Sequence, residues 1–222
     1  MRIIEPTVDE IVFHIHEGYT IEQWLERAGR TCYKSENKIT ENSAPKFIRM
    51  LRKRGHHAML EHAMASVRII ADRGLTHEIV RHRIASFAQE STRYCNYSKN
   101  KFDHQITVVK QPGLTDEQQK IWNISMLNTE AAYFDLINAG VKAQIARSVL
   151  PIGIKSEIII SANLREWMHI FHMRCDTPAH PIIRKCAIEI LKEFNNRLPS
   201  MYENHAERFI KCPNQNQEED VS

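Results

Sequence analysis

The stretch RHRIASFAQESTRY, residues 81–94, combines four positive or potentially positive side chains with hydroxyl, amide and carboxylate groups. Val80, Ile84 and Phe87 lie at i, i+4 and i+7, which predicts one buried face of a helix, and Thr76 is a candidate N-cap. Arg offers planar, forked donors, and Ser and Gln add short neutral contacts, so the mixture suits a planar, polar, anionic ligand. Alternatively, the basic residues form a solvated helix face.

Capping signals and apolar spacing predict further elements on both sides of this stretch. Thr20 with Gln23 resembles a capping box, and Thr115 with Gln118 resembles another, at the start of a long helix that ends at Gly140. Other helices are expected over 43–55, 141–150, 163–174 and 182–194, and strands over 65–70, 104–110 and 156–162. Strands and helices do not alternate as βαβ units. The sequence therefore predicts an α+β, mostly helical single domain around a modest β-sheet.

The composition of the 222 residues is that of an ordinary globular protein, with 42% hydrophobic and 26% charged residues. We expect one catalytic domain over 1–212 and a disordered polar tail over 213–222. The net charge of +3 is too small to require nucleic acid, and no stretch approaches the roughly 20 apolar residues that span a membrane. Without a signal-peptide pattern, and with five widely spaced cysteines, a cytoplasmic location with reduced thiols is expected.

The twelve histidines raise the question of a metal site. His77 and His82 lie at i, i+5, roughly 140° apart around a helix, so they cannot share one ion. His169 and His172 could face together, but no third ligand is suitably spaced, and we expect no metal. The seven glycines form neither G-x-G-x-x-G nor G-x-x-x-x-G-K, so side chains, mainly Arg, would have to hold any bound nucleotide.

Two further polar clusters stand out along the chain. GHHAMLEH, residues 55–62, follows an expected helix end, and a buried His–Glu pair in a loop is its simpler interpretation. In NLREWMHIFHMR, residues 163–174, Arg165, His169 and His172 lie at i, i+4 and i+7 on one helical face. Here the simpler interpretation is an amphipathic helix with a wet face.

Taken together, these segments resemble a known family. RHRIASFAQESTRY matches R-H-R-x-x-S-x-x-x-x-S-x-R-Y, the signature of the flavin-dependent thymidylate synthases, at every fixed position. The resemblance extends to GHHAMLEH, ARSVLP and NLREWMHIFHMR, in the family's order, over roughly residues 31–184. It implies conversion of dUMP to dTMP, with methylenetetrahydrofolate as carbon donor and NADPH-reduced FAD as hydride source. It also implies a homotetramer with active sites shared between subunits.

The resemblance also assigns site residues by their position in the motifs. Those implied to contact FAD are His56, Ala58, Glu61, Arg81, His82, Arg83, Gln89, Asn163, Leu164, Arg165 and His169. Those implied to bind dUMP are Glu78, Arg81, Gln89, Glu90, Ser91, Thr92, Arg93, Arg147 and Arg174. Arg174 would approach the uracil ring, where a fixed cation favours loss of the imide proton and polarises the ring for attack. It is the candidate catalytic residue.

A covalent role for Ser91 is the alternative to substrate binding. A serine nucleophile needs a base, and the neighbours Glu90, Thr92 and Arg93 do not indicate one, so a binding role is favoured.

Two other functions stay open at this point. Ala58 stands where the family commonly has Thr or Ser, and residues 177–183 depart from its pattern, which favours an inactive flavin-binding remnant. The segment FIRMLRKRGHH, residues 47–57, favours a basic nucleic-acid-binding module. Against that module, no RNP-like, homeodomain-like or zinc-finger pattern accompanies it.

Overall fold

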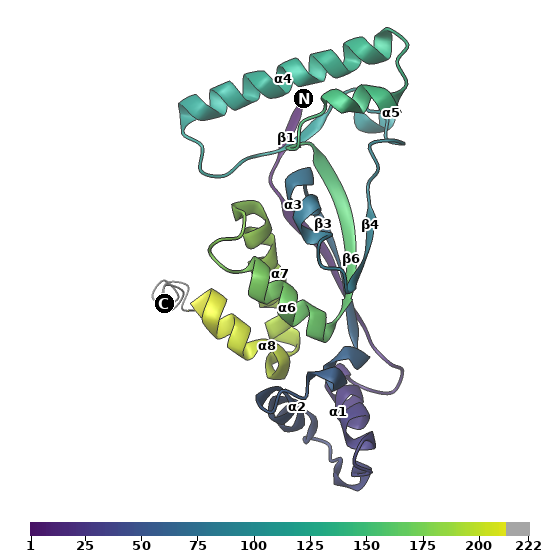
Figure 1. The fold of residues 1–222 in the computed structure, drawn as a ribbon, viewed down its shortest axis with the longest axis vertical. Helices are drawn as coiled ribbons and strands as arrows, with labels where there is room; N and C mark the ends of the chain where they lie inside the picture. Colours follow the sequence, from purple (N-terminus) through teal and green to yellow (C-terminus); the bar gives the residue numbers. More distant parts are fainter. Residues whose placement is uncertain (212–222) are drawn as a thin grey trace. The chain divides into compact units, whose positions relative to one another are not determined.

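A computed structural model describes residues 1–211 of the chain (Figure 1). The strands are β1 (Arg2–Ile4), β2 (Thr7–His14), β3 (Met64–Asp72), β4 (Ala85–Gln89), β5 (Thr107–Val109) and β6 (Lys155–Asn163). The helices are α1 (Ile21–Thr31), α2 (Ala44–Lys53), α3 (Arg73–Ile79), α4 (Asp116–Asn138), α5 (Ala143–Ala146), α6 (Leu164–Arg174), α7 (Pro181–Arg197) and α8 (Pro199–Ala206). Short 3-10 helices are η1 (Glu36–Lys38), η2 (His57–His62), η3 (Asn100–Phe102) and η4 (Arg147–Val149), and η5 (Glu207–Lys211) is a short π-helix. The predicted α+β, mostly helical class is confirmed.

Two β-sheets organise the strands. One has four strands in the order β2-β3-β6-β4, and the other pairs β1 with β5 in parallel, so that Arg2 lies opposite Thr107. The sequence prediction missed β1 and β2. In β2, Phe13 is the buried side chain, so the apolar alternation that reveals a half-buried strand is weak there.

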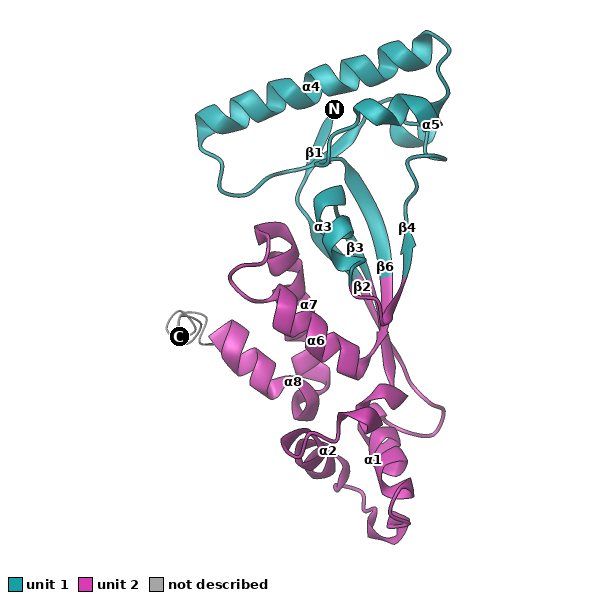
Figure 2. Cartoon of the chain, in the orientation of Figure 1, with its two compact units in different colours: residues 1–9, 68–81, 87–159 teal, residues 10–67, 82–86, 160–222 magenta. Residues whose placement is uncertain are grey.

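The chain divides into two compact units (Figure 2). Unit 1 holds residues 1–9, 68–81 and 87–159, and unit 2 holds residues 10–67, 82–86 and the chain from 160 onward. The expected single catalytic domain over 1–212 remains a prediction, and the expected tail over 213–222 lies outside the described residues. Within the described residues, no helix is long and apolar enough to cross a membrane.

Each unit has its own core. In unit 1, buried side chains of β5 and α4 pack with neighbouring segments: Tyr97, Ile106, Val108, Met126, Tyr133, Ala146 and Ile154. In unit 2, α6, α7 and α8 pack against one another around aromatic rings. The Trp167 ring centroid lies 5.0 Å from that of Phe194 and 5.6 Å from that of Phe171. The Trp167 indole N–H also donates to the Ala65 carbonyl at 3.1 Å, which fixes α6 against β3.

The predicted helix across residues 76–87 was wrong. α3 begins earlier, because the Asp72 side chain accepts a hydrogen bond from Leu75 N at 2.8 Å and so acts as the N-cap. Thr76 therefore lies inside α3. Residues 85–89 form β4, in which less exposed and exposed side chains alternate with the period of two that a strand requires. Ile84, expected to be buried, is 71% exposed.

Most other predicted elements are confirmed. Thr20 with Gln23 and Thr115 with Gln118 form complete capping boxes at α1 and α4. The strand expected over 104–110 is shortened to β5, and the helix expected over 141–150 is divided into α5 and η4. The prediction missed α8, which begins at Pro199, a residue that tolerates the first turn of a helix.

The histidine of α8 gives a testable pH dependence of stability. Burial, together with the nearby Arg52 and His172, lowers the pKa of His205 to about 4. The unfolded pKa is about 6.5, so the folded state binds fewer protons, and this contribution to stability is lost as the pH falls from 6.5 towards 4. Between about pH 7 and pH 5, we expect wild type to lose up to about 2 kcal/mol more unfolding free energy than His205→Gln.

Denaturant unfolding of both proteins at the two pH values measures this difference. All other titrating groups are shared, so the comparison isolates His205. Equal losses in the two proteins would show that His205 titrates normally in the folded state.

Candidate active site

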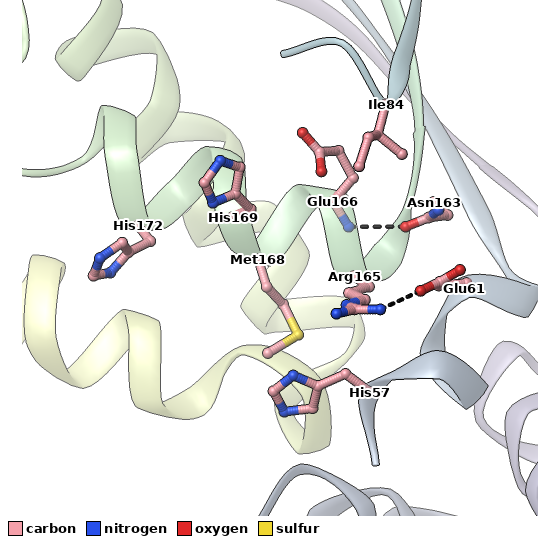
Figure 3. Close-up of a pocket in the computed structure, with 9 residues that line it drawn as sticks. All are labelled: His57, Glu61, Ile84, Asn163, Arg165, Glu166, Met168, His169 and His172. Carbon is pink, nitrogen blue, oxygen red and sulfur yellow. Dashed lines mark hydrogen bonds and ion pairs between the residues drawn. The ribbon is translucent and has the colours of Figure 1, made fainter. Parts of the chain in front are cut away.

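The start of α6 lines a pocket of about 610 Å³ in unit 2 (Figure 3). The lining side chains come from η2, the segment before β4, the end of β6, and α6: His57, Glu61, Ile84, Asn163, Arg165, Glu166, Met168, His169 and His172. Asn163 caps α6 as predicted, because its side chain accepts a hydrogen bond from Glu166 N at 2.8 Å. This volume is within the range of small-molecule sites, which are few in a protein.

The pocket wall mixes cationic, amide, imidazole and carboxylate groups. Arg165 makes an ion pair with Glu61, which Figure 3 shows between α6 and η2. Leu164 is fully buried behind this wall, its N–H donating to the Ala63 carbonyl at 2.9 Å. The pocket wall therefore offers both hydrogen-bond donors and acceptors, as a planar polar ligand requires.

A buried polar cluster adjoins the pocket through Glu166. His82 is 6% exposed and Glu166 is 7% exposed, and His82 Nδ1 lies 3.5 Å from Glu166 Oε1. On the other side of the ring, Arg174 Nε donates a hydrogen bond to His82 Nε2 at 3.0 Å. Burial, together with the nearby Arg174 and His169, lowers the pKa of His82 to about 4, so the ring is neutral near pH 7. Burial also raises the pKa of Glu166.

Three side chains of this region lie close enough together to bind one metal ion. The possible ligand atoms of His82, Glu166 and His169 all lie within 4.8 Å of one another. Sequence spacing did not reveal this grouping, because His82 is remote from α6 in the chain. Metal binding needs an unprotonated nitrogen, whereas the Arg174 contact leaves the proton of the neutral ring on Nδ1, which faces Glu166. The absence of a metal stays a prediction.

A second cavity of unit 2, of about 440 Å³, contains two of the residues implied to contact FAD, His56 and Ala58. It lies among α1, α2 and η2, with Tyr33 and Phe47 in its wall. The implied FAD residues of unit 2 are thus divided between two cavities. Glu61, Asn163, Arg165 and His169 line the first, whereas Arg83 lies at the surface.

Unit 1 brings together most residues implied to bind dUMP. Arg147 Nη1 donates to the Thr92 hydroxyl at 3.3 Å. Arg93 Nε donates to Gln144 Oε1 at 3.3 Å, and both arginines are exposed. Cationic side chains thus flank the segment after β4, as an anion site requires.

Gln89 and Glu90 are anchored in the same unit. Gln89 Nε2 donates to the Thr76 hydroxyl at 2.8 Å and to the Ser156 hydroxyl at 3.2 Å. Glu90 forms an ion pair with Lys155 at 2.9 Å. Glu78 lies on α3, also in unit 1.

The division into units separates some of the predicted residues. Arg81 and Gln89, implied for both ligands, belong to unit 1, and His82 and Arg83 belong to unit 2. Arg174, the candidate catalytic residue, ends α6 in unit 2.

Ser91 gives a second testable prediction. Its hydroxyl oxygen accepts a hydrogen bond from Arg93 N at 3.3 Å, a contact that supplies no base. We expect Ser91→Ala to retain measurable turnover with an increased KM for the nucleotide, since one hydroxyl contact of about 0.5–1.5 kcal/mol is lost. Steady-state kinetics measures both parameters. Complete loss of turnover in a folded, flavin-loaded variant would indicate a nucleophile.

Sequence reasoning missed several residues that line the α6 pocket. His57, Met168 and His172 lie in the two polar clusters, so their segments were found although they were not assigned roles. Glu166 lay in the same segment, but its significance comes from the contact with His82, for which the sequence gives no local signal.

These features are those of a small-molecule pocket lined by Arg, His and amide side chains instead of a glycine-rich loop. A family model described as thymidylate synthase complementing protein matches residues 17–200. The chain is 32% identical to the flavin-dependent thymidylate synthase of Geobacter sulfurreducens, over 79% of this chain and 78% of that protein. It is 34% identical to that of Pyrococcus furiosus, over 76% of this chain and 70% of that protein. The chain therefore belongs to the flavin-dependent thymidylate synthase family.

A solved structure has the same fold. The UMP/dUMP methylase PolB from Streptomyces cacaoi, bound with 5-Br dUMP, aligns with a TM-score of 0.74 over 94% of this chain and 98% of that chain. The sequences are 18% identical, so this likeness supports the fold assignment alone.

Proposed function

We propose that this chain is a flavin-dependent thymidylate synthase that converts dUMP to dTMP. Methylenetetrahydrofolate is the carbon donor, and FAD reduced by NADPH is the hydride source. Membership of the family, at 32–34% identity over about three quarters of the chain, is the observation that carries the proposal. A cytoplasmic location is part of it.

The residues of the α6 pocket fit a flavin. Asn163, Arg165 and His169 supply amide, guanidinium and imidazole groups around a space of about 610 Å³. When bound, the flavin supplies the hydride. The role of the chain is to orient the ring and to place cationic donors where reduction adds negative charge.

The nucleotide is held by the arginine-rich segment of unit 1. Arg93 and Arg147 bind the phosphate through forked donors, and Gln89 and Ser91 add neutral contacts. Arg174 holds the uracil ring and favours its deprotonated, polarised form. The hydroxyl of Ser91 accepts a hydrogen bond from the backbone N–H of Arg93, which cannot act as a base. The proposed role of Ser91 is therefore to bind the nucleotide.

A homotetramer with shared active sites completes the proposal. On α4, Ile121, Ile124 and Leu127 are 64%, 59% and 50% exposed. Apolar side chains gathered on an exposed helix favour a protein interface, and identical subunits are the usual partners. Light scattering of the purified protein should give about four times the mass of one chain.

Flavin uptake and turnover test the proposal directly. Purified protein should be yellow or turn yellow with FAD, and should oxidise NADPH in a dUMP-dependent way. A colourless protein that takes up no FAD would contradict it.

Growth of a thymidine-requiring cell that expresses this chain separates an active enzyme from a flavin-binding remnant. Tight, salt-sensitive binding of oligonucleotides would instead favour the nucleic-acid-binding alternative.

A further inference from the structure

We propose that His82 and Glu166 are positioning residues that act on the reaction through Arg174. This inference rests on the proposed function, because it needs Arg174 to contact the nucleotide. It also gives His82 a different role from the flavin contact that the family resemblance implies.

The contacts of His82 determine which nitrogen carries its proton. Arg174 has only hydrogen-bond donors, so its Nε–H at 3.0 Å requires an unprotonated His82 Nε2. A neutral ring then carries its proton on Nδ1, the atom 3.5 Å from Glu166 Oε1. At 3.5 Å the Glu166 contact is electrostatic rather than a short hydrogen bond, and a carboxylate there favours the proton on Nδ1.

Burial gives this arrangement its strength. His82 and Glu166 are each more than nine-tenths buried, so their contact is little screened by water. Arg174 is half-buried at the end of α6, where a long side chain has many rotamers to choose from. The hydrogen bond from Arg174 Nε to the buried imidazole restricts the rotamers of the Arg174 side chain. The two terminal nitrogens of the guanidinium are thereby held in one orientation.

Two other roles for the cluster agree less well with these contacts. A metal ion at His82, Glu166 and His169 would need the Nδ1 lone pair, because Nε2 already accepts a hydrogen bond from Arg174. A purely structural role would make His82 important for folding rather than for the nucleotide. The experiments below distinguish all three roles.

The protonation state of His82 is the first measurement. In purified protein labelled with ¹⁵N-histidine, with or without added flavin, the resonances of His82 are identified by their disappearance in His82→Gln. We expect a protonated Nδ1 and an unprotonated Nε2 near pH 7, unchanged by added Zn²⁺. The opposite tautomer, a cationic ring, or a Zn²⁺-dependent shift of Nδ1 would overturn the proposal. This result does not depend on turnover, so it stands apart from the proposed function.

Kinetics of paired variants are the second measurement. His82→Ala should lower kcat/KM for dUMP by about 10- to 100-fold, the range for losing a hydrogen bond to a charged group. His82→Gln should recover most of that loss, because its amide oxygen can accept from Arg174. Glu166→Gln should lower kcat/KM less than His82→Ala. His77→Ala, an exposed histidine on α3, serves as the matched control and should match wild type.

A double-variant cycle isolates the path through Arg174. If His82 acts through Arg174, His82→Ala should cost little further activity in an Arg174→Ala background. Additive losses would overturn the proposal, as would a drop in flavin content and denaturation midpoint large enough to explain the His82→Ala kinetics. If wild type binds no flavin and makes no dTMP, the proposed function fails, while the tautomer measurement still tests the contact itself.

Discussion

Arg174→Ala should lower the rate of dTMP formation by at least about 100-fold, the effect of removing one charge-stabilising donor from a preorganised site. The guanidinium is the cation held by the buried His82, and it is proposed to polarise the uracil ring. Without it, the ring binds but loses the charge that favours its activated form. The loss should therefore appear in kcat as well as in KM.

Single-turnover reactions with pre-reduced flavin measure this effect on the steps that involve dUMP. Arg174→Lys should be intermediate, because it keeps the charge but not the planar fork or the Nε donor. Arg27→Ala, an exposed arginine on α1, is the control and should keep wild-type activity. If Arg174→Ala turns over within a few fold of wild type, Arg174 is not the catalytic residue.

Trp167→Ala should cost about 4–5 kcal/mol of unfolding free energy, as truncating a large aromatic side chain in a core does. Trp167 is fully buried between Phe171 and Phe194, and its indole N–H donates to the Ala65 carbonyl at 3.1 Å. The variant leaves a cavity and removes the donor to that carbonyl. Because α6 also carries Arg165 and His169, which are proposed to hold the flavin, the loss of packing should reduce flavin content as well.

Denaturant unfolding at one fixed protein concentration measures this loss, since stability depends on concentration in an oligomer. Trp167→Phe keeps most of the ring volume and should cost only about 1–2 kcal/mol, mainly for the unpaired carbonyl. Trp24→Ala is the matched control, because Trp24 is partly exposed and also donates to a carbonyl, that of His62, at 3.0 Å. A loss for Trp167→Ala no larger than for Trp24→Ala would contradict the assignment of Trp167 to the core.

The sequence predicted elements wherever a local signal was complete. Thr20 with Gln23, Thr115 with Gln118, and Asn163 marked helix starts that the structure reproduces, because a cap satisfies backbone N–H groups within one turn. The prediction failed over 80–87, where a helical spacing of apolar residues coincided with a strand. Asp72, rather than Thr76, caps α3 and so determines where that helix starts. Residues 85–89 form β4 because they pair with β6.

The same distinction holds for the site. The motif residues and their chemistry are local, so the sequence by itself determined the family, the arginine-rich segment and the polar face of α6. The grouping of His82 with Glu166 and Arg174, and the separation of Arg174 from Arg93 and Arg147 into different units, depend on packing between remote segments. The tertiary structure alone decided these, because contacts with Arg174 and Glu166, which are remote from His82 in the chain, fix which nitrogen of His82 holds the proton.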